Sequence, residues 1–276
     1  MHNKSLMARL MAAPHVVWSV LFILAPLAFV FYYAFTDKTG AFTLNNVKEL
    51  GSTSYLDIFT RSLCFALAAT AICLLVAYPL AYAISRAKPR SQKICIMLTM
   101  LPMWMNFLIR TYSIMAILED TGFLNSLLGR IGLPPLHIIN TGGAVIFGMV
   151  YNYLPYMVLP IYTVLSKLDN RLLEASADLG CTPMQTFFKE VMPLSRSGVV
   201  SGVTMVFVPS VSTFYISQKL GGGKFQLIGD VIERQFQSAY NYNLGAAMSL
   251  VLMVLILLSL AVMNRYSDEE EGGLVA

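Results

Sequence analysis

The residues of this sequence that could take part in chemistry are few, and they fall into short polar runs. In one run, Glu174 and Asp178 stand four residues apart, which places both carboxylates on one face of a helix. Elsewhere, hydroxyl, amide and tyrosine side chains recur at helical spacing inside apolar stretches. Carboxylates on a helix suit docking to a partner, and tyrosine ring faces attract alkylammonium groups. The residue types therefore favour recognition over bond-making chemistry.

The apolar stretches of the sequence lack the side chains that enzymes usually use to make or break bonds. No cluster of His, Asp or Glu lies within an apolar stretch, which argues against an enzyme. The run Gly221 to Lys224 lacks the GxxxxGK[ST] spacing of a phosphate-binding loop, and Phe225 stands where Ser or Thr is needed. The histidines and cysteines are His2, His15, His137, Cys64, Cys73, Cys95 and Cys181. Because they form neither a CxxC pair nor a disulfide framework, we expect this chain to bind no metal or cofactor.

The elements that must position these polar groups are membrane helices. The chain has 276 residues, of which 57% are hydrophobic and only 12% charged. Its mean hydropathy is +0.65, outside the range of an ordinary soluble domain. A helix needs roughly 20 apolar residues to cross a bilayer. Six stretches qualify, near 16–35, 62–84, 94–118, 143–166, 198–218 and 243–264.

Lysine and arginine are unevenly distributed over the connections, and cytoplasmic connections carry the excess. The richer set is Lys4, Arg9, Arg86, Lys88, Arg90, Lys93, Lys167, Arg171, Lys189, Arg196 and Arg265. The poorer set is Lys38, Lys48, Arg61, Arg130, Lys219, Lys224 and Arg234. We therefore predict that both termini and the segment 167–197 lie in the cytoplasm. The net charge of +4 reflects this bias and does not indicate nucleic-acid binding.

The connections predict one transmembrane domain, residues 1–276. Those predicted to be outer, 36–61, 119–142 and 219–242, are too short to fold alone and are expected to hold amphipathic turns. The first span could be a cleaved signal peptide, but the bulky run Phe31 to Phe35 favours a retained anchor. Gly198 and Gly202 form a small-xxx-small pair that lets another helix approach closely.

Segment 167–197 interrupts the spans with two predicted short helices. Asp169 is a good N-cap for a helix that begins at Asn170, and Gly180 would end it in the left-handed conformation. The run Thr182 to Gln185 forms a capping box for a second helix, which Pro193 is expected to stop. By itself this pattern fits either an interfacial loop or a docking element.

The same segment resembles the EAA loop of ABC importer permeases, in which Glu-Ala-Ala precedes a glycine and a later proline. Glu174, Ala175, Gly180 and Pro193 fall on that register. Ser176 replaces the second alanine, and Glu190 and Met192 replace the isoleucine and leucine before the proline. The resemblance implies a helix that couples the spans to a separate ATPase, which would use ATP and Mg. The implied coupling residues are Glu174, Ala175, Ser176, Asp178, Leu179 and Gly180.

Two further runs resemble the spermidine/putrescine permeases of the PotB type, and the similarity extends over nearly the whole chain. These runs are Pro102 to Tyr112, and Leu220 to Lys224 together with Leu227 to Ile232. The resemblance implies an all-α permease with six transmembrane helices and the type I ABC importer fold, in the inner membrane. It implies as partners an ABC ATPase dimer, a second homologous permease and an extracytoplasmic solute-binding protein. Relatives move other small cationic or amino-acid-like solutes, so these remain an alternative.

Polar stripes within the spans are candidates for the translocation path, because such residues usually face the bundle or a wet cavity. The candidates are Asn106, Arg110 and Ser113; Asn152 and Tyr156; Ser210, Thr213 and Ser217 at i, i+3 and i+7; and Tyr215. The alternative is that their hydroxyls bond within helices and hold them together. A pore-facing Arg110 would repel a polycation, so we expect it to pair with a carboxylate near the outer mouth or on a partner subunit.

A transporter from another class, driven by an ion and acting alone, is the main rival. Such proteins place ionisable groups near the middle of the membrane. No Asp or Glu lies within a predicted span of this chain. This pattern favours an external energy source.

Overall fold

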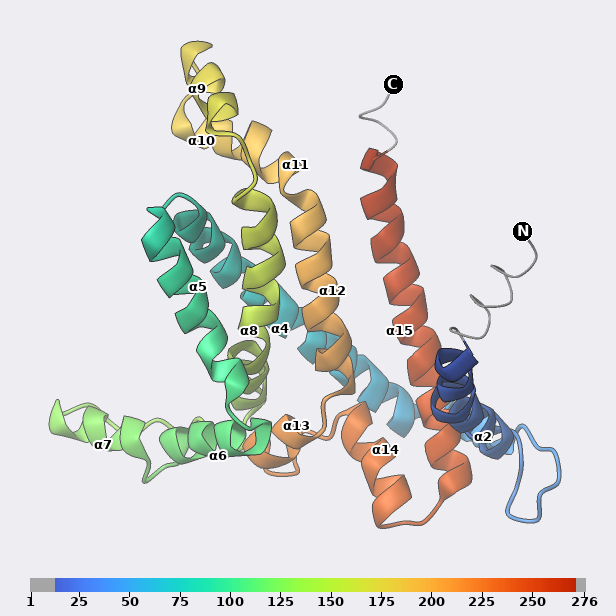
Figure 1. Ribbon diagram of the computed structural model, residues 1–276. Helices are drawn as coiled ribbons and strands as arrows, with labels where there is room; N and C mark the ends of the chain where they lie inside the picture. Colours follow the sequence, from blue (N-terminus) through green and yellow to red (C-terminus); the bar gives the residue numbers. More distant parts are fainter. Residues whose placement is uncertain (1–12, 272–276) are drawn as a thin grey trace, which may run out of the picture. The chain divides into compact units, whose positions relative to one another are not determined.

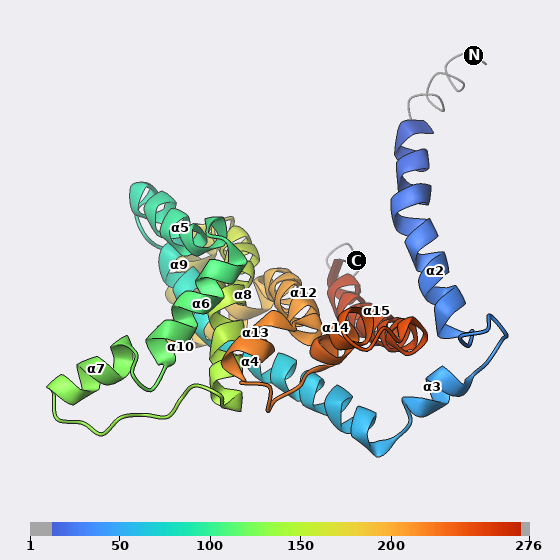
Figure 2. The same ribbon diagram turned by 90° about the horizontal axis from the view of Figure 1, so that it is seen from below.

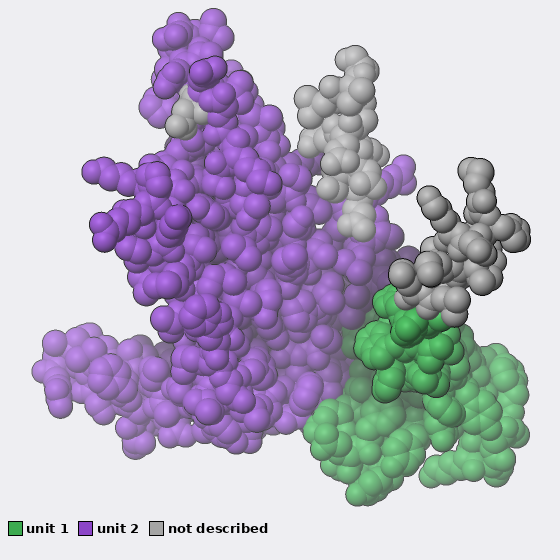
Figure 3. All heavy atoms as spheres, in the orientation of Figure 1, with its two compact units in different colours: residues 1–57, 231–255 green, residues 58–230, 256–276 purple. Residues whose placement is uncertain are grey.

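The computed structural model describes residues 13–271, and its described part is built from helices, with one isolated antiparallel bridge between Thr36 and Phe42 (Figure 1). The chain forms two compact units, residues 1–57 with 231–255, and residues 58–230 with 256–276 (Figure 3). The single membrane domain and the cytoplasmic placement of both termini stay predictions. Lys4 and Arg9 lie outside the described residues.

Four described helices are long and apolar enough to cross a membrane without a break. The first covers residues 13–34 and contains the π-helical stretch η1 (Val20–Leu24) and α2 (Ala25–Ala34). The others are α4 (Thr53–Ser85), α8 (Gly142–Leu165) and the apolar part of α15 (Tyr242–Glu271), which runs to Met263. These helices correspond to the predicted spans 16–35, 62–84, 143–166 and 243–264.

The predicted spans 94–118 and 198–218 are wrong as continuous helices. The first divides into α5 (Pro89–Trp104) and α6 (Phe107–Leu118), and the axis from α6 into α7 (Phe123–Arg130) is bent by 95° from α5. The second ends with α12 (Arg196–Ser212), after which α13 (Tyr215–Leu220) begins a separate helix. The pair Pro183–Leu194 and α12 is itself bent by 64°. The described residues thus give four spans, or six if each bent pair counts as one.

A helix cap explains the first break. Met105 is extended, and the Asn106 side-chain oxygen accepts hydrogen bonds from the backbone N–H groups of Leu108 (2.9 Å) and Ile109 (3.5 Å). These two bonds satisfy the N–H groups of Leu108 and Ile109, which would otherwise have backbone partners in a continuous helix. They therefore favour the start of a new helix at Phe107. Pro102 weakens the preceding turn because it offers no N–H.

The core of the larger unit lies where α8 and α12 pack against each other. Gly198 and Gly202 allow the close approach that the sequence predicts: a Cβ at Gly198 would lie 2.9 Å from the carbonyl oxygen of Pro160, and one at Gly202 would lie 2.8 Å from the sulfur of Met157. On α8, Gly148 meets α13, because a Cβ there would lie 2.9 Å from Ile216. Small residues let the helix backbones come together where larger side chains would clash.

The short helices of the larger unit gather at the two ends of α8. α9 (Asn170–Asp178) and α10 (Pro183–Thr186) lie beyond its C-terminal end, while α6, α7 and α13 lie near its other end (Figure 1). The view from below shows α7 standing away from the rest of this unit (Figure 2). α7 and α14 (Ile228–Gln237) match the amphipathic turns that were predicted for two of the outer connections.

The smaller unit is held by hydrogen bonds from amide side chains. Asn243 Nδ2 donates to the backbone oxygens of Tyr33 (3.1 Å) and Thr36 (2.7 Å). Asn46 Nδ2, next to α3 (Asn45–Glu49), donates to the oxygens of Ala34 (3.1 Å) and Thr36 (2.9 Å). These bonds satisfy the carbonyls left free where α2 ends.

Candidate functional site

The first helix of segment 167–197 has the caps that the sequence predicts. The Asp169 carboxylate accepts a hydrogen bond from the Arg171 backbone N–H at 2.9 Å. At the other end Gly180 has φ +83°, the Gly180 N–H donates to the Ala177 oxygen (2.9 Å) and the Cys181 N–H donates to the Ser176 oxygen (3.1 Å). This pair of bonds is a Schellman motif, which requires a left-handed residue after the helix.

The second helix begins as predicted but ends later. The capping box is present, since the Thr182 N–H donates to Gln185 Oε1 (2.8 Å) and the Gln185 N–H donates to Thr182 Oγ1 (3.4 Å). α10 continues as the π-helical stretch η2 (Phe187–Val191) and then α11 (Met192–Leu194). The expectation that Pro193 stops the helix is therefore wrong. Pro193 lies just after the π-helical stretch, at the second residue of α11, and the helix ends one residue later at Leu194.

A buried hydrogen bond ties the two helices to each other. The hydroxyls of Ser176 and Thr186 are 2.8 Å apart, and both side chains are buried. Ser176, predicted as part of a coupling surface, therefore points into the segment. The other predicted coupling residues, Glu174, Ala175, Asp178, Leu179 and Gly180, are exposed, and the Leu179 side chain is 85% exposed. In the isolated chain, these residues form an exposed surface that another protein can contact.

The second helix of the segment packs on α4 through Phe187. The Phe187 ring meets Tyr78 (centroids 5.5 Å apart) and Tyr82 (5.4 Å) edge to face. The Tyr78 hydroxyl lies 2.6 Å from the Ser195 hydroxyl, just after α11. Ring packing and a buried hydrogen bond therefore connect segment 167–197 to α4. The sequence showed Phe187 as apolar, but nothing in its spacing identified Tyr78 and Tyr82 as its partners.

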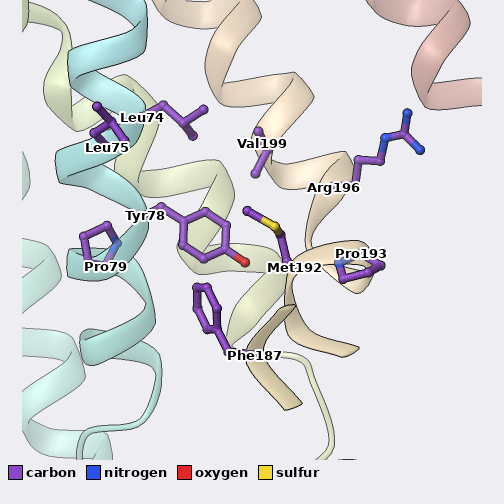
Figure 4. A pocket seen from close by; sticks show the side chains of 9 residues that line it. All are labelled: Leu74, Leu75, Tyr78, Pro79, Phe187, Met192, Pro193, Arg196 and Val199. Carbon is purple, nitrogen blue, oxygen red and sulfur yellow. The ribbon is translucent and has the colours of Figure 1, made fainter. Parts of the chain in front are cut away.

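A cavity of about 660 Å³ lies beside this contact (Figure 4). The figure shows Tyr78 and Phe187 facing each other on one side, and Met192 beside them. Its lining residues are Leu74, Leu75, Tyr78, Pro79, Phe187, Met192, Pro193, Arg196 and Val199. The walls are almost entirely apolar, and Arg196 is the one charged residue among these lining residues.

The predicted stripe Asn106, Arg110 and Ser113 lies at the start of α6, after the break, and its members differ in burial. Asn106 is the exposed cap of α6, whereas Arg110 is buried and 7% exposed. Arg110 and Ser113 line a second cavity, of about 470 Å³. The Asn followed by an apolar run, shortly after Pro102, was a signal for this cap that the sequence analysis did not use.

The stripe on α8 divides between interior and surface. Asn152 is fully buried, and its Nδ2 donates to the Gly148 oxygen at 2.8 Å. Its Oδ1 has no partner among the described residues. Tyr156 is 39% exposed, with its ring centroid 6.5 Å from that of Tyr153. Of the two, only Tyr156 has a ring face open to solvent or lipid in the single chain.

The predicted alignment of Ser210, Thr213 and Ser217 is wrong, because the chain breaks between α12 and α13. Thr213 lies in the break. Ser210 Oγ donates to the Val206 oxygen (2.6 Å) and Ser217 Oγ to the Phe214 oxygen (2.7 Å). These two hydroxyls bond to backbone oxygens three or four residues earlier, which favours the structural alternative for both.

Tyr215 belongs to a group that already holds an ammonium. Its ring meets Tyr112 edge to face at 6.1 Å, and the Lys219 Nζ lies 5.3 Å from the Tyr112 centroid and 5.7 Å from that of Tyr215. Both distances are within the range of cation–π attraction. The sequence analysis selected Tyr215 but not Tyr112 or Lys219, since the break before α13 decides that the three meet.

Comparisons with known proteins agree with this architecture. Residues 5–269 match the family described as binding-protein-dependent transport system inner membrane component. The chain is 38% identical over 256 residues to the spermidine/putrescine transport system permease protein PotB of Haemophilus influenzae, covering 90% of each chain. It is 37% identical over 258 residues to PotB of Escherichia coli, covering 91% of this chain and 94% of the relative.

One solved structure shares the fold over nearly the whole length. It is a chain of a bacterial ABC transporter that imports the acidic polysaccharide alginate, with a TM-score of 0.79. The alignment covers 97% of this chain and 96% of the other, at 16% identity. At that identity the similarity describes the fold and not the solute.

Proposed function

The chain belongs to the family of binding-protein-dependent transport system inner membrane components, and on that basis we propose that it carries polyamines such as putrescine and spermidine through an ATP-driven importer. It is a multi-pass inner-membrane permease subunit of the ABC class and a transport component, not an enzyme. The polyamine assignment is supported by the two relatives named as spermidine/putrescine permeases, which align with at least 90% of the chain.

The proposed assembly contains three kinds of partner. An ABC ATPase dimer binds ATP and Mg and docks on segment 167–197. A second, homologous permease completes the pathway, and an extracytoplasmic binding protein delivers the solute. An external energy source fits the sequence, because no predicted span contains a carboxylate that could carry a coupling ion.

The observation that carries the coupling role is the continuous set of contacts from the exposed surface to a span. Leu179 and its neighbours are exposed, Ser176 binds Thr186, and Phe187 follows directly and packs on Tyr78 of α4. When the ATPase dimer closes, its movement is transmitted through these contacts to α4. The pathway then opens alternately to the two sides of the membrane. Such coupling requires that the contacts with the ATPase differ between the two conformations of the permease.

The group of Tyr112, Tyr215 and Lys219 shows which rings of this chain attract an ammonium, although Lys219 itself occupies them and repels a second cation, so a solute ammonium must displace it. Two tyrosine rings hold a primary ammonium at 5.3 and 5.7 Å, which is the chemical group at each end of a polyamine. Cation–π attraction at an exposed site contributes about 0.5–1 kcal/mol. Such weak binding suits a pathway, so the binding protein supplies most of the selectivity.

A crosslinking experiment tests the coupling surface. Single cysteines would be placed at Leu179 and, as a control, at Leu127 on α7, in a chain whose Cys64, Cys95 and Cys181 are serine. Both positions are exposed, at 85% and 48%. In the assembled complex we expect position 179 to crosslink to the ATPase subunit and position 127 not to. Equal crosslinking at both positions, or none at 179, would contradict the docking role.

An uptake experiment tests the solute separately. The complete complex in liposomes, with the binding protein outside and ATP inside, should accumulate labelled putrescine or spermidine, and unlabelled amino acids should not compete. Glu174→Lys should abolish uptake and binding-protein-stimulated ATP hydrolysis while leaving insertion intact, because it reverses a charge on the docking surface. ATP-dependent uptake of amino acids but not polyamines would remove the polyamine assignment and leave the coupling role standing.

A further inference from the structure

The second cavity of the larger unit lies at the bend between α5 and α6 and combines apolar walls with one buried cation. Its volume is about 470 Å³, within the range of roughly 300–1,000 Å³ typical of ligand sites. The lining residues are Met105, Arg110, Ser113, Ile114, Ile117, Leu118, Leu124, Ile138, Phe147 and Tyr151. Apart from Arg110, none of these side chains carries a charge.

Arg110 is not neutralised within the part of the chain that the structure describes. Its Nη1 donates to the Pro102 oxygen at 3.0 Å, and its Cζ lies 5.8 Å from the Phe107 ring centroid. Its Nε is buried and has no hydrogen-bond partner among the described residues. The expected carboxylate near the outer mouth does not pair with it: Glu119 is exposed at the far end of α6, about 14 Å along the helix axis.

The bend also places Arg110 relative to α5. α5 ends at Trp104, and α6 continues into α7 at 95° to it, so that these helices run across the direction of the span. Arg110 lies in the first turn of α6. Arg110 therefore lies close to the end of α5, at the start of a helix that runs across the direction of α5.

We propose that the cavity holds an anionic phospholipid, with its phosphate on Arg110 and an acyl chain along the apolar walls. A guanidinium offers phosphate several N–H donors in a planar fork, and the buried Nε supplies one that is otherwise unpaired. Ile117, Phe147 and Tyr151 at the rim are 45%, 50% and 38% exposed, so an acyl chain can enter from the bilayer. Of these three, Tyr151 is of a residue type that is enriched at the membrane–water interface.

The chemistry of the walls favours a lipid over the other occupants. A carboxylate from a protein partner would neutralise Arg110 but would leave the apolar volume without matching groups. A polyamine would be repelled by the guanidinium and would find no anion in the lining. A lipid bound here braces the bend between α5 and α6, the element that departs most from a straight span. This inference does not depend on which solute is transported.

The test uses the complete importer complex in detergent, with dioctanoyl phosphatidylglycerol as the anionic probe and dioctanoylglycerol as its uncharged counterpart, and native mass spectrometry as the readout. The variants are Arg110→Gln, which removes the cation, and Ile117→Trp, which fills the rim. Arg130→Gln is the matched control, because Arg130 is an exposed arginine on α7. We expect Arg110→Gln to weaken binding of the phosphatidylglycerol about tenfold or more, as loss of a charge-assisted contact implies, and Arg130→Gln to leave it unchanged.

Three results would overturn the proposal. Equal phosphatidylglycerol binding in wild type and Arg110→Gln would show that the guanidinium holds no phosphate. Equally tight binding of the uncharged probe by the wild-type complex would show a site for chains alone, and this comparison needs no variant that might misfold. A photo-crosslinker at Ile117 that captures the second permease instead of lipid would show that a protein fills the cavity.

Discussion

Replacement of Gly180 by alanine isolates the backbone requirement of the exposed segment. Gly180 has φ +83°, and a Cβ built there would meet no atom within 4 Å. The alanine therefore causes no clash, and the cost comes only from the left-handed backbone. That cost is about 1–2 kcal/mol for a residue with a Cβ.

The cost translates directly into a change in local opening. Since 1.4 kcal/mol corresponds to a factor of ten, Gly180→Ala should raise the open population of the α9–α10 connection about 5- to 30-fold. The bonds that open are the Gly180 N–H to Ala177 and the Cys181 N–H to Ser176. The effect should be local, because the rest of the chain keeps its packing.

Hydrogen exchange of the assembled complex, read on peptides covering residues 176–186, measures this opening. We expect the amides of this connection to exchange about 5- to 30-fold faster in Gly180→Ala. Gly180→Asn should show a smaller increase, because asparagine tolerates the left-handed region better. Gly129→Ala is the matched control: it also adds a Cβ in open space, but in a helix, where alanine is favoured by about 1 kcal/mol.

Unchanged exchange in Gly180→Ala would refute the argument, because it would mean that the left-handed glycine does not hold the connection together. Faster exchange in Gly129→Ala at the same peptides would also contradict it, since that change is remote and unstrained. If the exchange rises as expected, ATP-dependent uptake should fall in the same order, with Gly180→Ala below Gly180→Asn.

Two further predictions concern packing. Phe187→Ala should lower the free energy of unfolding of the complex by about 2–3 kcal/mol, because it removes the ring contacts with Tyr78 and Tyr82 of α4. The same change should uncouple ATP hydrolysis from uptake. The exposed Phe188→Ala should cost less than about 1 kcal/mol, and equal losses from the two changes would contradict the role of Phe187 in joining the segment to α4. Gly198→Ala should lower the free energy of unfolding by about 1–3 kcal/mol, which is more than Gly202→Ala should cost. The reason is that the new Cβ at position 198 meets the rigid Pro160 carbonyl, whereas that at position 202 first meets the flexible Met157 side chain. Calorimetry of both variants measures this difference, and a larger loss in Gly202→Ala would refute the packing argument.

Local features could be predicted from the sequence because they depend on residues a few positions apart. The Asp169 cap, the Thr182 capping box and the left-handed Gly180 are all confirmed. Each is a bond between neighbouring backbone and side-chain groups, and the short range leaves few alternatives. The membrane class followed from the length and number of apolar stretches, which the bilayer requires whatever the tertiary packing.

Breaks in the spans were harder to predict, because hydropathy does not report helix continuity. The run 94–118 is apolar enough to cross a membrane, yet the Asn106 side chain competes for the backbone donors and starts a new helix. The chain also breaks between Ser212 and Tyr215, where α13 begins without a side-chain cap. As a result, Ser210, Thr213 and Ser217, which share a face of an ideal helix, were assigned to one stripe although a break divides them.

The sequence by itself determined the membrane class, the helix caps of segment 167–197 and the resemblance of that segment to a coupling element. Only the tertiary structure decided that Ser176 turns inward to Thr186, that Phe187 packs on Tyr78 and that Arg110 lies buried without a carboxylate. The physical reason is the separation along the sequence. A helix cap is a hydrogen bond between residues a few positions apart, whereas Phe187 and Tyr78 lie on separate helices that meet only when the larger unit packs. Which side chains meet across that distance depends on helix positions, and the apolar pattern of a membrane span leaves those positions open.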